Sequence, residues 1–193
     1  MADDDAEARE EVHEDDAVPE PPPPNDEVAA ALVAQFTDAV FAESHGQPVV
    51  YVPRAEWHEV AAFLRDEQQF TQCVDVTAVD QLVAPSRAVP AAVVAERFEV
   101  VANFLSHARN RRIRVIAQVP FDDPTIASIT DLYPGVNFAE RETYDLFGVE
   151  FSDHPDLTRI LMPEDWEGHP LRKDYEVGQI PVQFSSAVPG ESA

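Results

Sequence analysis

One stretch of the sequence, residues 138–175, restricts what this chain can fold into more than any other. It reads FAERETYDLFGVEFSDHPDLTRILMPEDWEGHPLRKDY. Pro155, Pro163 and Pro170 interrupt any regular element in its second half, because proline lacks an amide hydrogen and has a fixed φ. That half is nevertheless rich in apolar side chains: Phe151, Leu157, Ile160, Leu161, Met162, Trp166, Leu171 and Tyr175. A long irregular segment this apolar needs burial, either by its own domain or by a partner protein.

The first third of the stretch predicts a short helix over residues 138–147. Asn137 is a suitable N-cap, because its side-chain oxygen can accept an otherwise unpaired backbone N–H. Gly148 suits a left-handed C-cap. A helix of under three turns needs tertiary packing to be stable.

The charges on this helix follow from its spacing. Glu140 and Glu142 fall in the first turn, where the helix dipole favours anions. They are two residues apart, so they point to different faces and cannot act as a paired acid and base. Arg141 and Asp145 are four apart and can form an ion pair.

Two histidines of the stretch, His154 and His169, each precede a proline. Two imidazoles and a carboxylate can hold a transition metal, but this spacing matches no compact ligand motif such as HExxH. We interpret both as histidines that hydrogen-bond to backbone in an irregular segment. No glycine-rich phosphate loop occurs among the six glycines, so the sequence predicts no phosphate or dinucleotide site in this chain.

We interpret residues 151–177 as an extended strap that binds a partner protein. Aromatic anchors are typical of interface hot spots, and prolines lower the entropy lost when an extended segment is held in place. The aromatic anchors of the strap are Phe151, Trp166 and Tyr175. The hydrogen-bond donors of the strap and of the preceding helix are Arg141, Arg159, Arg172 and Lys173.

Residues 28–150 predict one α+β domain, with a mixed sheet layered against helices. The expected helices cover residues 28–43, 56–67 and 123–132, and the expected strands cover 48–52, 73–83, 97–106 and 112–119. The last two strands alternate apolar and polar residues and form a hairpin. On the strand expected over 73–83, Val74, Val76 and Ala78 share one face. Asp75, Thr77 and Asp80 are interpreted as polar residues on its solvent face or at its end.

The turn of that hairpin carries the one basic cluster of an acidic protein: Arg109, Arg111, Arg112 and Arg114. Two interpretations stay open. The cluster either contacts an acidic partner surface or is solvated and pairs with the protein's own carboxylates. Nucleic-acid binding would need more basic surface and interleaved aromatic residues.

Charge and composition exclude several classes of protein. The net charge is −24, and residues 1–27 hold twelve acids and one arginine. Such a charge argues against nucleic acid and against anionic lipid as partners. Low hydrophobicity, high charge and a proline run predict disorder for residues 1–27, and residues 178–193 are also expected to be partly disordered.

The single cysteine, Cys73, cannot form an internal disulfide or hold an iron–sulfur cluster, which takes about four cysteines. No stretch reaches the ~20 apolar residues of a membrane helix, and no signal peptide is evident. Any association with a membrane is therefore expected to be indirect, through another protein.

Three pieces of the sequence carry a family resemblance: ERETYDLFG, then FSDHPDLTRIL, then GHPLRKDY. In order and spacing they resemble the C-type subunit of bacterial NADH-quinone oxidoreductase, the thirty-kilodalton-type subunit of respiratory complex I. Weaker similarity extends over roughly residues 28–177. The positions in the matching motif are Glu140, Arg141, Glu142, Asp145, Gly148, His154, Pro155, Arg159, His169, Pro170, Arg172 and Lys173, and Trp166 lies among them.

The resemblance implies a non-catalytic subunit of the peripheral arm, on the cytoplasmic face of the cell membrane. It would carry no cofactor, with FMN and iron–sulfur clusters in partner subunits. It would pack mainly on the D-type, forty-nine-kilodalton-type subunit and brace the quinone-reducing module, and so contribute to NADH-to-quinone electron transfer and coupled proton pumping. The motif residues would have structural and interfacial roles.

Alternatives remain at this point. Related subunits occur in membrane hydrogenases and in other quinone oxidoreductases. A free-standing enzyme that uses the carboxylates and histidines, or an adaptor unrelated to respiration, belongs to a different class.

Overall fold

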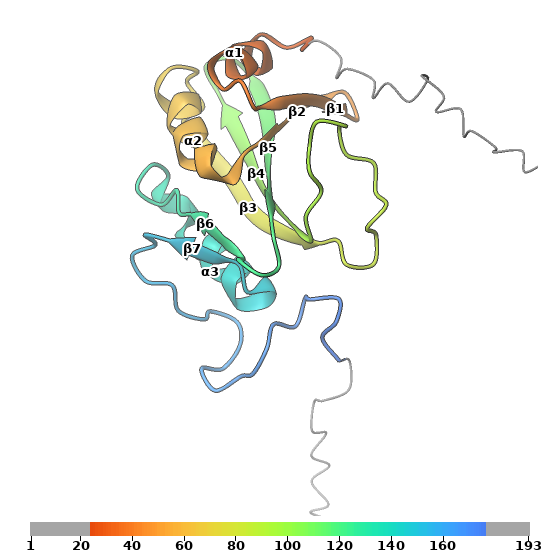
Figure 1. Ribbon diagram of the computed structural model, residues 1–193. Coiled ribbons are helices and arrows are strands. Elements are labelled where there is room, and N and C mark those ends of the chain that lie inside the picture. Colours follow the sequence, from red (N-terminus) through yellow and green to blue (C-terminus); the bar gives the residue numbers. More distant parts are fainter. Residues whose placement is uncertain (1–23, 177–193) are drawn as a thin grey trace, which may run out of the picture.

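The computed structural model describes residues 24–176 (Figure 1). A five-stranded sheet runs in the order β1-β2-β5-β4-β3, with β1 at Val40–Ser44, β2 at Gln47–Val52, β3 at Gln72–Asp80, β4 at Phe98–Ser106 and β5 at Arg111–Val119. The β2–β5 pair is parallel and the other pairs are antiparallel, so the sheet is mixed. The predicted α+β class is thereby confirmed.

The predicted hairpin is confirmed in both its strands and its inward face. Phe98 pairs with Val119, and the next inward pairs are Val100 with Ala117, Ala102 with Val115 and Phe104 with Ile113. All eight side chains are buried. Alternation of apolar residues specifies this register, because a slip by one residue would turn every apolar side chain toward the opposite face.

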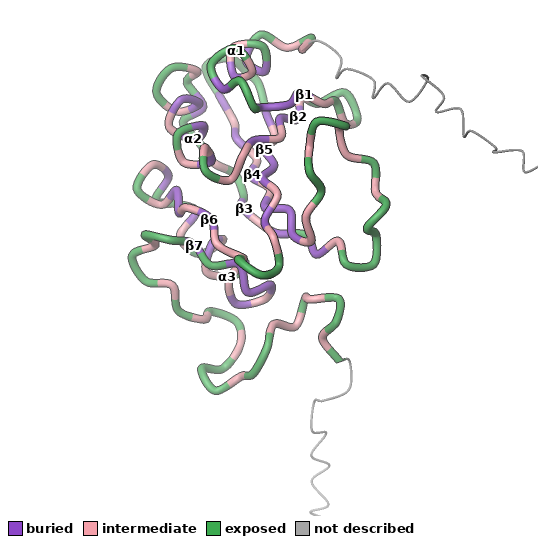
Figure 2. Tube along the Cα trace, viewed as in Figure 1, coloured by how far each residue is buried: buried purple, intermediate pink, exposed green. Residues whose placement is uncertain are grey.

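Three helices pack on this apolar face: α1 (Glu27–Gln35), α2 (Trp57–Asp66) and α3 (Asn137–Phe147). The irregular segment 81–97 lies over the opposite face, where Arg87 pairs with Glu99 of β4 (Figure 1). Figure 2 shows the buried residues concentrated on the sheet and on the sheet-facing sides of the helices. On α2, Trp57, Val60, Ala61 and Leu64 are buried along one side of the helix.

The first predicted helix, over residues 28–43, is wrong in its second half. The helix ends at Gln35, and Val40–Ser44 forms β1, which pairs with β2 across a turn at His45 and Gly46. Both turn residues have positive φ (54° and 73°), as a tight hairpin between twisted strands requires. Apolar residues at helical spacing continue into β1, but pairing with β2 outweighs that local pattern.

Two further predictions in the domain are corrected. Residues 123–132 form no helix: Thr125–Ala127 is a short strand, β6, that pairs in parallel with β7 at Glu150–Ser152. On β3, Val74 does not share the buried face of Val76 and Ala78 and is 46% exposed. A register shift between Cys73 and Asp75 turns it outward, as a β-bulge does.

Helix α3 follows a 3₁₀ turn, Pro134–Val136, and begins one residue earlier than predicted. Asn137 is its first residue rather than its cap, and no side chain caps its N-terminus. Gly148 ends the helix in the predicted left-handed conformation, with φ 72°. Within residues 24–176 no helix is long and apolar enough to cross a membrane. Of residues 1–27, which were expected to be disordered, Asp26 caps α1 and Glu27 begins it. Residues 1–23 and 178–193 lie outside the described residues.

Candidate functional site: the docked strap

The strap crosses the lower end of the domain beside α3, on the opposite side of the molecule from α1 (Figure 1). Its first two residues lie in β7, where Phe151 is buried. From residue 153 to 176 it has no helix or strand. Such a segment must find partners for its backbone groups outside regular structure, and two buried aspartates supply the most important of them.

Asp145, on the inward side of α3, is the first of these aspartates. Its carboxylate is completely buried. Oδ2 accepts hydrogen bonds from three successive strap amides, those of Ile160, Leu161 and Met162, at 3.0, 2.7 and 2.8 Å. Oδ1 accepts from Arg159 Nη1 at 2.7 Å. Burial alone would raise the pKa of Asp145, but these donors outweigh it and hold the pKa below its ordinary value.

The predicted ion pair between Arg141 and Asp145 does not form. Arg141 instead donates to the carbonyl oxygens of Thr158 and Arg159 and to the Thr158 hydroxyl, so it also holds the strap. Arg159 takes its place at Asp145 and bridges onward to the carbonyl of Gly168. Spacing along the helix allowed the first pair, but a donor from the strap reaches the buried carboxylate more directly.

The end of α3 receives the second half of the strap. Arg172 Nε donates to the carbonyl of Phe147 at 2.6 Å, which satisfies one of the last free carbonyls of the helix. His169 Nδ1 donates to the carbonyl of Asp145 at 3.0 Å. Burial lowers the pKa of His169, which favours the neutral ring. Because a carbonyl oxygen only accepts, Nδ1 carries the proton in this contact.

Gly148 is required at this point for two reasons. Its φ of 72° is unfavourable for other residues. A Cβ placed there would lie 2.6 Å from the His169 ring and would also contact the Arg172 guanidinium. The glycine therefore lets the strap pack directly against the helix end.

Asp80, at the end of β3, is the second buried aspartate. Its Oδ2 accepts from the amide of Lys173 at 2.8 Å, and both carboxylate oxygens accept from Arg97, at 3.0 and 2.8 Å. Arg97 also donates to both oxygens of Asp174. Burial would raise the pKa of Asp80, but these donors lower it overall. One arginine thus joins the sheet to the strap.

Aromatic rings support the two arginines at this junction. The Arg97 guanidinium lies 5.1 Å from the Phe98 ring centre and 4.5 Å from that of Phe121. Arg172 lies over the same two rings, at 5.3 and 5.7 Å. Cation–π contacts of this kind contribute about 0.5–1 kcal/mol at exposed sites and more when desolvated. The rings therefore hold both cations in place although they carry the same charge.

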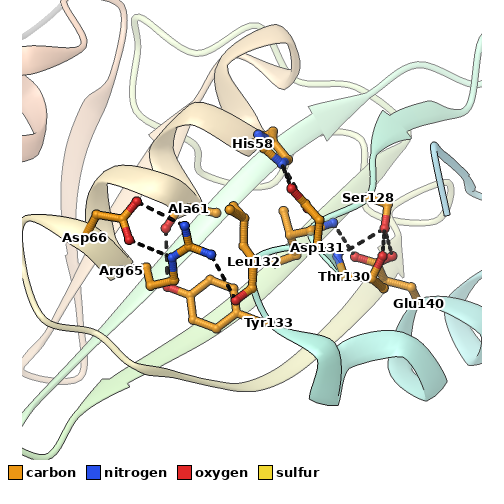
Figure 3. Close-up of polar contacts among 11 residues, drawn as sticks. His58, Ala61, Arg65, Asp66, Ser128, Thr130, Asp131, Leu132, Tyr133 and Glu140 are labelled. Carbon is orange, nitrogen blue, oxygen red and sulfur yellow. Dashed lines mark hydrogen bonds and ion pairs between the residues drawn. The ribbon is translucent and has the colours of Figure 1, made fainter. Parts of the chain in front are cut away.

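Glu140 has an internal role. Its side chain is fully buried, and it accepts from the Ser128 hydroxyl at 2.6 Å and from the Ile129 amide at 2.9 Å (Figure 3). In the same view the Tyr133 hydroxyl donates to the carbonyl of Ala61. It also lies 2.8 Å from the carbonyl of Phe70. Burial raises the pKa of Glu140 to about 7. This carboxyl joins α3 to residues 128–130 and offers no surface to a partner.

The remaining motif residues lie along the strap or on the outer side of α3. Glu142, Pro155 and Lys173 are exposed, and His154, Trp166 and Pro170 are half-buried. His154 has its Nε2 3.3 Å from the carbonyl of Asn137 and its Nδ1 accepts from the Asp156 amide. His154 and His169 therefore both contact backbone, as interpreted from the sequence. Among the described residues no group of three His, Cys, Asp or Glu side chains is placed to hold a metal ion.

The docked strap leaves a set of large apolar side chains in contact with solvent. Leu161 is 60% exposed, Leu171 43% and Ile160 37%, and Phe138 on the neighbouring first turn of α3 is 64% exposed. Figure 2 shows the strap almost entirely as exposed or intermediate. The sequence left open whether the domain or a partner buries the strap. The domain binds the strap backbone, but much of the apolar surface of the strap stays exposed.

Sequence reasoning missed Asp80, Arg97 and Asp174 as strap residues. Asp80 and Lys173 are far apart in the chain, and a lone aspartate at a strand end is also common in ordinary sheets. The one available signal was the apolar alternation of β3, which ends at an acid.

A pocket of about 610 Å³ that includes Tyr51, Arg54 and Gln118 lies away from the strap, beneath segment 81–97.

These residues define a class of protein: a small α+β domain whose last helix and sheet edge bind a long irregular segment. Residues 50–180 match the model of the family described as the respiratory-chain NADH dehydrogenase, 30 Kd subunit. The chain therefore belongs to this family, as the sequence motifs predicted.

Relatives and solved structures agree with this assignment. The chain is 42% identical to the C-type subunit of NADH-quinone oxidoreductase from Saccharopolyspora erythraea over 74% of its own length and 54% of the relative, and 42% identical to that of Roseiflexus castenholzii over 82% and 87%. It thus spans about half the length of several of these relatives.

Among solved structures, a trypsin-resistant fragment of Nqo5 superimposes with a TM-score of 0.58 at 32% identity, covering 67% of this chain and 96% of the fragment. An archaeal membrane-bound sulfane sulfur reductase complex contains a chain with a TM-score of 0.61 at 22% identity, covering 78% and 84%, which shows a shared fold.

Proposed function

We propose that this chain is a cofactor-free subunit of a proton-translocating NADH:quinone oxidoreductase and braces its quinone-reducing module by packing on the D-type subunit. The family membership and the names of the relatives support the assignment to that complex. In this proposal the chain has no active site of its own, and other subunits oxidise NADH and carry FMN and the iron–sulfur clusters. It reaches the cytoplasmic face of the membrane through those partners.

The observation that carries the bracing role is the way the strap is fixed. Three successive amides on Asp145 hold the backbone of residues 160–162 in one conformation. The side chains of Ile160 and Leu161 nevertheless remain exposed. A segment that is ordered before binding loses less conformational entropy on association. Exposed apolar side chains on a rigid backbone are therefore suited to a permanent protein–protein contact.

The interfacial motif residues then divide into two groups. Asp145, Gly148, Arg159, His169 and Arg172 contact one another or the end of α3 and position the strap. The exposed residues beside them, including Glu142, Pro155 and Lys173, are free to contact the partner. We assign the direct contact to the exposed group and to Leu161 and Leu171.

The proposal is tested by affinity purification of the tagged full chain from detergent-solubilised membranes, with an NADH:quinone assay on the recovered assembly. We expect Leu161→Glu to reduce recovery of the assembly, because a charge would be buried at the contact. Val94→Glu, which alters a valine that is 77% exposed in segment 81–97, is the matched control. Recovery lost with Val94→Glu but kept with Leu161→Glu would refute the strap as the contact.

The identity of the partner needs a second measurement. A photo-crosslinking amino acid at position 161 should join the chain to the D-type subunit within the purified assembly. Crosslinks to a different subunit would refute D-type packing while leaving membership of the complex intact. An assembly that contains the chain but does not oxidise NADH would refute the electron donor.

A further inference from the structure

The turn between β4 and β5 and the first two residues of β5 present three arginines whose guanidinium groups have no partner among the described residues. Arg109, Arg111 and Arg112, here called the arginine tip, are all exposed. None of the three guanidinium groups forms an ion pair or hydrogen bond with any residue of the described range 24–176, although the backbone amide of Arg109 donates to the Ser106 hydroxyl. The other arginines of that range, from Arg54 to Arg172, all donate to protein oxygen atoms. The positive charge of the tip is therefore unusual in this chain.

The tip borders a shallow hollow of about 420 Å³. Arg111, Arg112 and His107 line one side of it, and Asp26 lines another. Asp26 caps α1 by accepting from the amides of Val28 and Ala29, so its place beside the hollow is fixed by the domain. The residues that precede Asp26 consequently join the domain at the edge of the arginine tip.

Those residues have the complementary charge. Residues 1–23 contain ten acids and one arginine, a formal charge of −9. The domain itself is acidic elsewhere, so it repels this segment at most other places. The segment joins the domain through four prolines, residues 21–24, which favour an extended spacer of about 3.1 Å per residue. Glu20 is therefore tethered within roughly 20 Å of Asp26, and the acids that precede it can turn back toward the tip.

We propose that the acidic segment, residues 3–20, binds the arginine tip of its own chain in and around this hollow. The proposal goes beyond the function proposed above and does not depend on it. Single exposed ion pairs contribute little, but a tether of this length gives the carboxylates an effective concentration on the order of millimolar at the tip. The bound segment thereby neutralises the positive charge of the arginine tip.

The test uses zero-length carbodiimide crosslinking of the purified full chain. The chain contains a single lysine, Lys173. Its amide is bound by Asp80, which pairs with Phe98 at the end of β4 farthest from the arginine tip. The variant Arg112→Lys keeps the charge of the tip and introduces an amine that can be coupled to a nearby carboxylate. Native Lys173 is an internal control in the same sample.

We expect a several-fold excess of crosslinks from the amine of R112K to the acids of residues 3–20 over crosslinks from Lys173 to those acids. The excess should disappear at 1 M salt, where the Debye length is about 3 Å. A mixture of isotopically light and heavy chains identifies crosslinks between copies. Equal coupling from both amines, an excess that salt does not reduce, coupling to Asp26 and Glu27 alone, or coupling mainly between copies would each overturn the proposal.

Retention on a heparin column supplies a second measurement. Neutralising the acids of residues 3–20 to their amides should make the full chain bind heparin more tightly, because the arginine tip is uncovered. Adding Arg109→Ala and Arg112→Ala to that variant should abolish the gain. Unchanged retention on neutralising the acids would contradict the proposed contact.

Discussion

Replacement of Asp145 by asparagine is the sharpest test of how the strap is held. Four donors meet this carboxylate, three backbone amides and the Arg159 guanidinium, at 2.7–3.0 Å. An asparagine side chain has the same shape, but it has one acceptor oxygen and turns an NH₂ group toward the remaining donors. Asp145→Asn therefore removes a buried charge and leaves donors facing a donor.

The size of the effect follows from the geometry. Hydrogen bonds to charged groups contribute about 1.5–3 kcal/mol each, and breaking a buried ion pair costs about 3–5 kcal/mol. The full sum is not lost, because the strap amides regain water when the strap detaches. We expect the free energy of local strap opening to fall by about 2–4 kcal/mol, which corresponds to roughly 30- to 1,000-fold faster amide exchange.

Hydrogen exchange followed by mass spectrometry measures this directly. Peptides that cover residues 159–163 should exchange faster in Asp145→Asn, while peptides from β4 should change little. Glu142→Gln is the matched control, because Glu142 lies on the same helix with its carboxylate exposed. Unaltered exchange in the strap, or equal acceleration in strap and β4, would refute the view that Asp145 holds the strap locally.

Three further outcomes are expected. Glu140, whose pKa burial raises to about 7 from an ordinary 4.5, contributes stability that is complete at low pH and lost as pH rises from about 4.5 through about 7. The free energy of unfolding of the unaltered protein should therefore decline by up to about 3 kcal/mol across that window. In Glu140→Gln it should change less with pH. Urea unfolding at several pH values measures both, and parallel pH profiles would contradict the prediction. Arg97→Lys should lower the unfolding free energy by about 1–3 kcal/mol, because lysine lacks the planar guanidinium that binds both oxygens of Asp80. Asp174→Asn, at an exposed carboxylate, should lower it by under about 1 kcal/mol. A larger loss in Asp174→Asn than in Arg97→Lys would refute Asp80 as the main partner of Arg97. Gly148→Ala should destabilise the docked strap by about 1–3 kcal/mol through its positive φ and the contact with Arg172, seen as faster proteolysis after residue 153; normal resistance would show that the helix end can adjust.

The parts of the fold that were predicted correctly share a physical feature. In the β4–β5 hairpin and in α2, the apolar period of the sequence matches the surface that the tertiary structure buries. The segments 28–43 and 123–132 failed where local pattern and tertiary pairing conflicted. Val40–Ser44 continues a helical spacing, yet it forms β1 because β2 offers a complete ladder of hydrogen bonds.

The candidate site divides in the same way. Residue types and spacing singled out Asp145, Arg159, His169 and Arg172, and the C-cap at Gly148 was predicted with its left-handed conformation. Their partners were not predictable: helical spacing offered Arg141 to Asp145, whereas the structure pairs Asp145 with Arg159. Several side chains within reach could satisfy one buried carboxylate, and sequence spacing does not rank them.

By itself, the sequence determined which segments carry regular structure through most of the sheet, which faces are apolar, and that an irregular segment, described over residues 153–176, follows the end of a helix. Local periodicity, proline and glycine set these features, so they can be recognised from neighbouring residues. Only the tertiary structure decided that Asp80 and Asp145 anchor the strap, that Glu140 is internal, and that Arg109, Arg111 and Arg112 stay unpaired within the described residues. Those outcomes depend on groups brought together from distant parts of the chain, where burial makes each carboxylate select its donors by geometry.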